Sequence, residues 1–63
     1  MENNIRELRE SNGWSQGELA ERCNVTRQTI NAIENNKYDP TLQLAFRLAK
    51  ALKVKVDELF YVD

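Results

Sequence analysis

Two helix start signals, at Ser15 and Thr26, stand so close together that they constrain the fold more than any other feature of the sequence. Ser15 is a favourable N-cap residue, and Glu18 three positions later completes a capping box. Trp14 and Leu19 flank this cap at the spacing of a hydrophobic staple. The helix that begins here must end before the second cap, so it is short.

The second signal predicts a helix that starts almost at once. Thr26 is its N-cap, and Val25 and Ile30 supply another hydrophobic staple. Asn24 occupies the turn between the two helices, where a left-handed residue is required and asparagine is tolerated better than most residues. The pattern therefore predicts two short helices joined by a tight turn, and Asn35-Asn36 ends the second helix.

Helical periodicity recurs through the rest of the chain. We expect a first helix over residues 4–11, a fourth that begins after a cap at Thr41, and a short fifth over residues 56–60. The end of the chain, Phe60-Tyr61-Val62, suits either a strand or a packed tail. The fold class that follows is all-α, with five helices and a short apolar C-terminal tail in one domain over residues 1–63.

The fourth helix is the most apolar of the five. Its main stripe consists of residues four apart, which are Leu44, Leu48 and Leu52. We expect this stripe to be widened by Leu42, Ala45 and Ala49. Phe46 lies off the stripe and is therefore expected to be exposed.

The composition excludes several kinds of site. With one cysteine and no histidine, the chain has neither an internal disulfide nor a conventional zinc site. It also lacks a phosphate-binding glycine loop and is too small for a substrate cavity, so we expect no enzyme activity, no cofactor and no small-molecule ligand. No apolar run approaches the about 20 residues that span a bilayer, and the first residues lack the pattern of a signal peptide. We expect no membrane partner and a cytoplasmic location.

The charges are unevenly distributed along the chain. The net charge is −1, which by itself argues weakly against a nucleic-acid partner. The segment from Arg22 to Lys37, however, contains three basic residues and one acidic residue, Glu34. The last seven residues contain three acidic residues and no basic ones. An acidic chain of this kind can still present one basic face.

The two capped helices have opposite apolar and polar faces. Leu19, Ala20 and Cys23 are expected to face the core from the first of them, and Ile30 and Ile33 from the second. The other side chains at the start of the second helix are polar and project outward. This arrangement is the supersecondary unit that places a recognition helix in the major groove of DNA.

The motifs along the chain resemble the Cro/C1 class of helix-turn-helix regulators. The similar stretches are residues 15–21, 25–30, 33–38, 40–45 and 57–60, so that nearly the whole chain is covered. Gly17 departs from the family pattern where a helix former is more usual, and Asn36 stands where glycine is usual. The resemblance implies a lambda-repressor-like DNA-binding domain with its helix-turn-helix unit at about residues 15–36.

The resemblance also implies roles for individual residues. Those expected to face base edges are Arg27, Gln28, Thr29 and Asn31. Those expected to contact the DNA backbone are Gln16, Thr26, Lys37, Tyr38 and Arg9. Gln16 is also expected to brace the recognition helix, and Arg27 can bind phosphate in place of a base. The simpler alternative is that this polar helix face is only solvated.

Three further residues are interpreted as structural. Glu34 is expected to accept an ion pair from a core-side arginine, Arg22 or Arg47, or to cap a neighbouring turn. Cys23 is expected to be a small buried hydrophobe, and Trp14 a core and staple residue rather than a platform for bases.

A single recognition helix reads too few base pairs for genomic specificity, so we expect a homodimer on a palindromic operator. The expected dimer interface consists of Phe46, Phe60, Tyr61 and Val62. The alternative is that the apolar tail covers the core of its own monomer. The predicted function is repression by operator occupancy, with activation left open. The alternative function is an antitoxin or protein-interaction module on the same fold.

Overall fold

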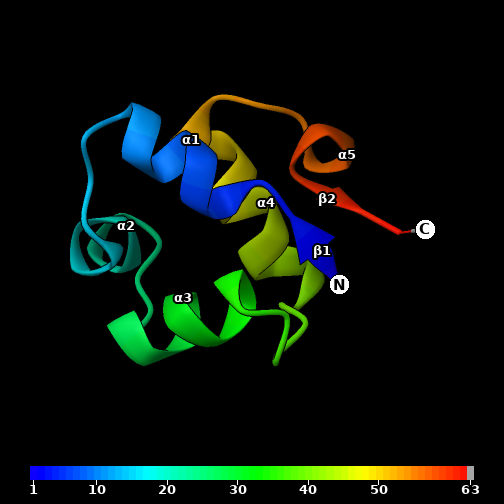
Figure 1. Cartoon of the computed structure of the whole chain (residues 1–63), viewed down its shortest axis with the longest axis horizontal. Helices are drawn as coiled ribbons and strands as arrows, with labels where there is room; N and C mark the ends of the chain where they lie inside the picture. The colour runs from blue at the N-terminus through cyan, green and yellow to red at the C-terminus, as the bar shows by residue number, and fades with distance from the viewer. Residues whose placement is uncertain (63) are drawn as a thin grey trace.

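The computed structural model describes residues 1–62, which form five helices and two very short strands (Figure 1). The helices are α1 (Ile5–Ser11), α2 (Gln16–Arg22), α3 (Arg27–Glu34), α4 (Leu42–Leu52) and α5 (Val56–Leu59). The strands are β1 (Glu2–Asn3) and β2 (Phe60–Tyr61). The predicted five-helix fold is confirmed, with helix ends close to the expected ones.

The helices begin where their side-chain caps are. The Oγ of Ser15 accepts a hydrogen bond from the backbone N–H of Glu18 at 3.1 Å, and the Glu18 carboxylate accepts one from the N–H of Ser15 at 2.9 Å. Thr26 and Thr41 cap α3 and α4 by accepting from the N–H groups of Thr29 and Leu44. All three predicted caps are confirmed.

The helices end at residues with left-handed backbone angles. Asn24 (φ 58°) follows α2 and Asn36 (φ 61°) follows α3, as expected for asparagine at these positions. Lys53 (φ 60°) ends α4 in the same way, which the sequence does not indicate because lysine has no preference for this region.

We expect Lys53→Gly to stabilise the protein by about 0.5–1 kcal/mol, because glycine adopts the left-handed angles without the Cβ clash. Lys53 is exposed, and among residues 1–62 its side chain has no hydrogen bond or ion pair that the substitution would remove. For a domain of this size, the melting temperature should rise by several degrees, measured by circular dichroism. Lys50→Gly, in the middle of the last helical turn, should lower it.

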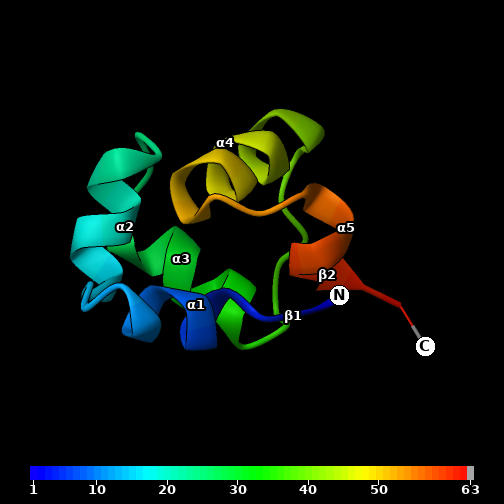
Figure 2. The same cartoon turned by 90° about the horizontal axis from the view of Figure 1, so that it is seen from above.

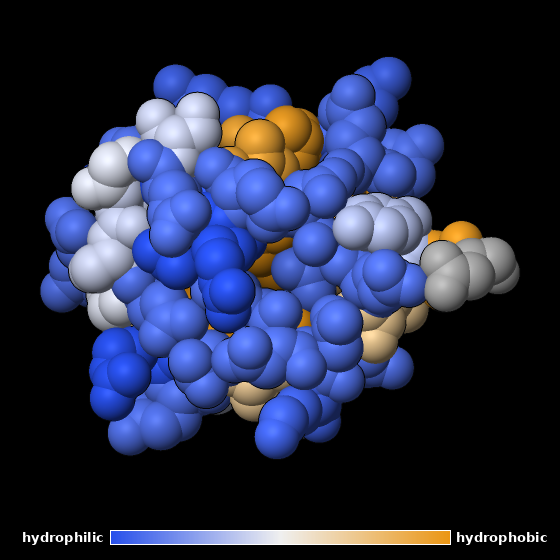
Figure 3. Space-filling view, in the orientation of Figure 1, coloured by the Kyte–Doolittle hydropathy of each residue, from blue (hydrophilic) through white to orange (hydrophobic). Residues whose placement is uncertain are grey.

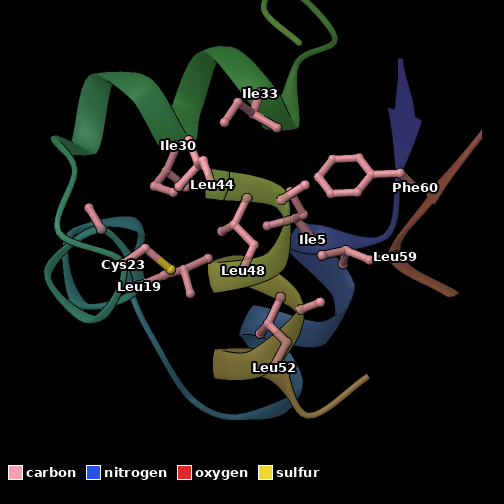
Figure 4. Close-up of a cluster of buried hydrophobic side chains, with 13 residues drawn as sticks. Ile5, Leu19, Cys23, Ile30, Ile33, Leu44, Leu48, Leu52, Leu59 and Phe60 are labelled. Carbon is pink, nitrogen blue, oxygen red and sulfur yellow. The ribbon is translucent and has the colours of Figure 1, made fainter. Parts of the chain in front are cut away.

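Helices α1, α3 and α4 surround the core, and α2 covers one side of it (Figures 1 and 2). Its completely buried side chains come from every helix and point toward one another (Figure 4), and they are Ile5, Leu19, Cys23, Ile30, Ile33, Leu48 and Leu59. Trp14 is half-buried and packs against this cluster. The expected core faces of α2 and α3 and the burial of Cys23 are therefore confirmed, and Trp14 packs against the core as expected. Its staple contact with Leu19 stays a prediction.

Two apolar residues lie elsewhere than predicted. Leu42 was expected to widen the buried stripe of α4 but is 70% exposed, since it lies in the first turn beyond the reach of the core. Phe60 was expected in a dimer interface but is only 8% exposed and packs into the core of its own chain (Figure 4).

The chain ends are joined by a two-stranded sheet. Strands β1 and β2 are antiparallel, with Glu2 opposite Tyr61 and Asn3 opposite Phe60. The side-chain amide of Asn3 donates to the carbonyl of Ile33 at 2.9 Å and so connects β1 to the end of α3. The C-terminal tail is thus a strand, one of the two forms the sequence allowed, whereas β1 is not indicated by any sequence pattern. Within residues 1–62, no helix has the length and apolar character needed to cross a membrane.

Candidate nucleic-acid interface

The interface is built on α2, α3 and the turn between them. The turn is closed by a hydrogen bond from the N–H of Val25 to the carbonyl of Ala20 at 3.0 Å. Ala20 is small and buried, which allows α3 to lie close against α2. This geometry turns the first residues of α3 away from the core, at the lower edge of the molecule in Figure 1.

Helix α3 has one buried and one exposed face. Ile30 and Ile33 are completely buried, and they hold the helix on the core. Arg27, Gln28 and Asn31 are exposed on the opposite face. In the space-filling view most of the surface is hydrophilic, with hydrophobic atoms in small areas only (Figure 3). Three of the four residues predicted to face bases are therefore brought together on one rigid surface.

The fourth predicted reader, Thr29, is half-buried at the edge of this surface. Its hydroxyl lies 3.0 Å from the hydroxyl of Thr26, which also accepts a hydrogen bond from the Thr29 N–H at 3.2 Å. The two hydroxyl groups therefore hold each other in place, and each has at most part of its hydrogen-bonding capacity left for a ligand.

Gln16 connects the start of α2 to α3. Its Nε2 donates to Oε1 of Glu34 at 3.0 Å, and its Oε1 accepts from Nδ2 of Asn31 at 3.4 Å. The structure thus places Gln16 as a brace for α3, as predicted. Gln16 is half-buried, at the border between the core and the polar surface.

Glu34 is the centre of a buried ionic cluster. Its side chain is 0% exposed, and it accepts hydrogen bonds from Arg9 Nε at 2.7 Å, Arg9 Nη2 at 3.2 Å and Arg6 Nε at 3.4 Å. Burial alone would raise the pKa of this carboxyl, but the hydrogen bonds from Arg9, Gln16 and Arg6 and the charge of Arg9 bring the pKa below its ordinary value. Glu34 is therefore a buried carboxylate at neutral pH.

The partner of Glu34 differs from the one predicted. A structural ion pair is present, but Arg22 and Arg47 do not form it, and Arg9 and Arg6 do. The guanidinium of Arg22 instead lies over the ring of Trp14, 4.1 Å from the ring centroid. Both cationic partners of Glu34 come from α1, which the sequence pattern did not connect to α3.

Arg9 was expected to contact phosphate, but its side chain is buried and paired with Glu34. It is only 8% exposed, and besides Glu34 it bonds the carbonyl of Trp14 through Nη1 at 2.8 Å. A signal for this was present in the sequence, because Arg9 stands four positions after the core residue Ile5 and so lies on the same helix face.

The two remaining phosphate candidates follow α3 directly. Lys37 and Tyr38 are both exposed, and the N–H of Lys37 donates to the carbonyl of Ala32 at 2.9 Å. They extend the polar surface of α3 beyond its C-terminal end. Within residues 1–62, no three His, Cys, Asp or Glu side chains are grouped so as to hold a metal ion.

Comparison with known proteins agrees with this geometry. The profile of a family described as helix-turn-helix matches residues 5–59. The HTH-type transcriptional regulator YgzD of Bacillus subtilis is 43% identical over 63 residues, covering 100% of this chain and 96% of that protein.

Solved structures show the same fold. The restriction-modification controller protein C.AhdI from Aeromonas hydrophila superposes with a TM-score of 0.84 at 33% identity, over 90% of this chain and 86% of that one. SinR, a master regulator of biofilm formation from Bacillus subtilis, crystallised in complex with DNA, superposes with a TM-score of 0.77 at 31% identity, over 84% and 86%. The chain therefore belongs to the Cro/C1-type helix-turn-helix family, whose members are DNA-binding transcriptional regulators and not enzymes.

Proposed function

We propose that residues 1–63 act as one domain that reads a short duplex sequence with the first two turns of α3 in the major groove. The single observation that carries this proposal is the two-faced α3, with Ile30 and Ile33 completely buried and Arg27, Gln28 and Asn31 exposed opposite them. A polar surface on a helix anchored in this way has few degrees of freedom to lose on binding.

The exposed side chains have the chemistry of base readers. Arg27 can donate two hydrogen bonds to guanine, and the carboxamides of Gln28 and Asn31 can bond adenine through two atoms. The methyl group of Thr29, at the edge of the surface, suits contact with a thymine methyl. The proposed backbone contacts are Gln16, Thr26, Lys37 and Tyr38. SinR, which shares the fold, has been crystallised with DNA, and this supports the same mode of binding here.

The proposal predicts that Gln28→Ala weakens the preference for one base pair of the selected site. Duplexes bound by the wild type are selected from a random pool and sequenced, and their affinities are then measured by fluorescence anisotropy. Because one bidentate contact contributes about 1–3 kcal/mol, Gln28→Ala should lower the preference for the base pair it reads by roughly fivefold to a hundredfold. Gln43→Ala, the same change at an exposed position of α4, should leave every base preference unchanged.

If no duplex is enriched even at low salt, where phosphate contacts are strongest, the DNA-reading proposal fails. In that case the fold would serve as an antitoxin or protein-interaction module, and its partner would be a protein. Enrichment of a site that Gln28→Ala does not weaken would show instead that α3 is docked differently.

We propose further that the chain acts as a homodimer on a palindromic operator, because one α3 contacts only a few base pairs. Helix α4 supports this, since Leu42 and Phe46, four positions apart, are 70% and 58% exposed on one face. Beside Phe46 lies an open hollow of about 570 Å³ whose apolar lining includes Ala49, Val54 and Val56. The exposed Tyr61 and Val62 remain in the proposed interface, whereas Phe60 belongs to the monomer core.

Such a dimer would repress transcription by occupying its operator and blocking polymerase. A reporter gene whose promoter overlaps the selected site tests this directly. Expression should fall when the protein is produced, and it should recover with Gln28→Ala. A rise in expression would identify the chain as an activator.

A further inference from the structure

A chain of hydrogen bonds leads from a buried carboxylate to the exposed Asn31. Nδ2 of Asn31 donates to Oε1 of Gln16, and Nε2 of Gln16 donates to Oε1 of Glu34. The chain begins on α3, passes through the start of α2 and returns to the end of α3.

The direction of this chain is determined at its buried end. A carboxylate has no proton and can only accept hydrogen bonds. Gln16 must therefore turn its amide nitrogen toward Glu34, which leaves its carbonyl oxygen facing Asn31. Asn31 must in turn present its amide nitrogen to Gln16. A glutamine or asparagine amide that is free to flip would have no such preference.

Glu34 is well suited to this role because it cannot rotate away or exchange with water. Its side chain is 0% exposed, and both of its oxygens are held by Arg9, one at 2.7 Å and the other at 3.2 Å. Arg6 is a further donor to the oxygen that Gln16 bonds. The neighbouring cations keep the carboxylate ionised at neutral pH, as their effect on its pKa indicates.

The outward edge of Asn31 is then defined. One N–H of its amide is directed to Gln16, so the second N–H and the oxygen Oδ1 remain for a base. This donor and acceptor match the N7 and N6 amino group of adenine. If the chain ran in the opposite direction, both N–H groups would point outward and would match the two acceptors of guanine instead.

We propose that Glu34 is a positioning residue that, through Gln16, orients the amide of Asn31 to read adenine rather than guanine. This inference rests on the proposed function, because it requires that Asn31 faces a base. It names the base that Asn31 selects and a buried residue that controls the selection without touching the DNA.

The experiment measures affinity for the selected duplex and for variants in which single A·T pairs are changed to G·C. Asn31→Ala identifies the base pair that Asn31 reads, where the preference for adenine should fall by about tenfold or more. Glu34→Gln supplies an amide that can face Gln16 with either atom, so the adenine preference at this same pair should narrow to about threefold or less. Gln16→Met breaks the chain and leaves Glu34 and Arg9 intact, which keeps the test valid if Glu34→Gln unfolds.

Gln16 is also a proposed phosphate contact, so Gln16→Met should weaken binding to all duplexes as well. Lys37→Met is the control for this uniform loss, because it should lower every affinity together and leave the adenine preference unchanged. In the double variant Gln16→Met/Asn31→Ala, the adenine preference should equal that of Asn31→Ala alone. This is expected because Gln16 acts on the preference only through Asn31.

The inference is wrong if Gln16→Met and Glu34→Gln retain the full adenine preference while the proteins remain folded by circular dichroism. It is also wrong if comparison of the wild type with Asn31→Ala shows that Asn31 selects guanine, or that it selects no base. Both outcomes are compatible with an operator that requires Gln28, so they are distinct from failure of the proposed function, in which no duplex is enriched.

Discussion

Replacing Arg9 with methionine is expected to lower the unfolding free energy by about 3–5 kcal/mol, because it leaves the buried carboxylate of Glu34 without its main partner. The side chain of Glu34 is 0% exposed, whereas its other cationic partner, Arg6, is half exposed and 3.4 Å away. A domain of this length has a total stability of about 3–9 kcal/mol, so the variant should lose a third or more of it. Urea denaturation followed by circular dichroism measures the loss.

A double variant separates the ion pair from simple packing. Arg9→Met/Glu34→Leu replaces both charges with apolar side chains of similar volume, and much of the stability lost in Arg9→Met should return. If the double variant is as unstable as the single one, the loss is due to shape and not to an unpaired charge. If Glu34 orients Asn31 through Gln16, this rescued protein should still lack the adenine preference, since it has no carboxylate to orient Gln16.

The pH dependence of stability provides an independent check on the same pair. The folded-state pKa of Glu34 lies below its ordinary value of about 4.3, so its contribution is fully present above that pH and is lost as the pH falls through the lowered pKa. The stability difference between the wild type and Arg9→Met should therefore shrink as the pH is lowered below about 4. A difference that stays constant down to pH 2 would contradict the assigned role of Glu34.

The second large effect is expected from Phe46→Glu, which should convert the proposed homodimer into a monomer. Phe46 is 58% exposed beside an apolar hollow, so the substitution costs the monomer little and places a charge in the proposed interface. Loss of one buried aromatic side chain from an interface costs about 2–4 kcal/mol of binding free energy per copy. The association constant should therefore fall by at least 30-fold. Sedimentation equilibrium over a range of protein concentrations measures the change.

Gln43→Glu adds the same charge at another exposed position of α4 and should leave the dimer intact. Monomeric Phe46→Glu should retain the folded circular dichroism spectrum and should bind half-sites but lose its preference for the full palindrome. A wild type that sediments as a monomer at every concentration would remove the homodimer from the proposal, without affecting the reading of DNA by α3.

The local elements were predictable because their causes are local. The capping bond between Ser15 and Glu18, like the cap at Thr26, joins residues only three positions apart, within one helical turn. The left-handed angles of Asn24 and Asn36 follow from the small polar side chain of asparagine. For the same reason the sequence pattern was sufficient to locate α3 and its exposed polar face, with three of the four predicted base readers.

The errors concern residues whose environment depends on distant segments. Arg9 was assigned to the DNA backbone because a surface arginine and a buried one look alike in sequence, and its partner Glu34 is 25 positions away. Phe60 was assigned to a dimer interface because an apolar tail can cover its own core or that of a second copy. Strand β1 exists only because β2 provides its hydrogen-bond partners.

The two caps and the turn at Asn24 thus follow from the sequence by itself, and with them the helix-turn-helix unit and the surface it presents. Only the tertiary structure decided that Glu34 is paired with Arg9 and bonded to Gln16, and hence which way the amide of Asn31 faces. The physical reason is the range of the interactions. A cap is complete within one turn of helix, whereas a buried ion pair forms only where packing excludes water from two segments at once.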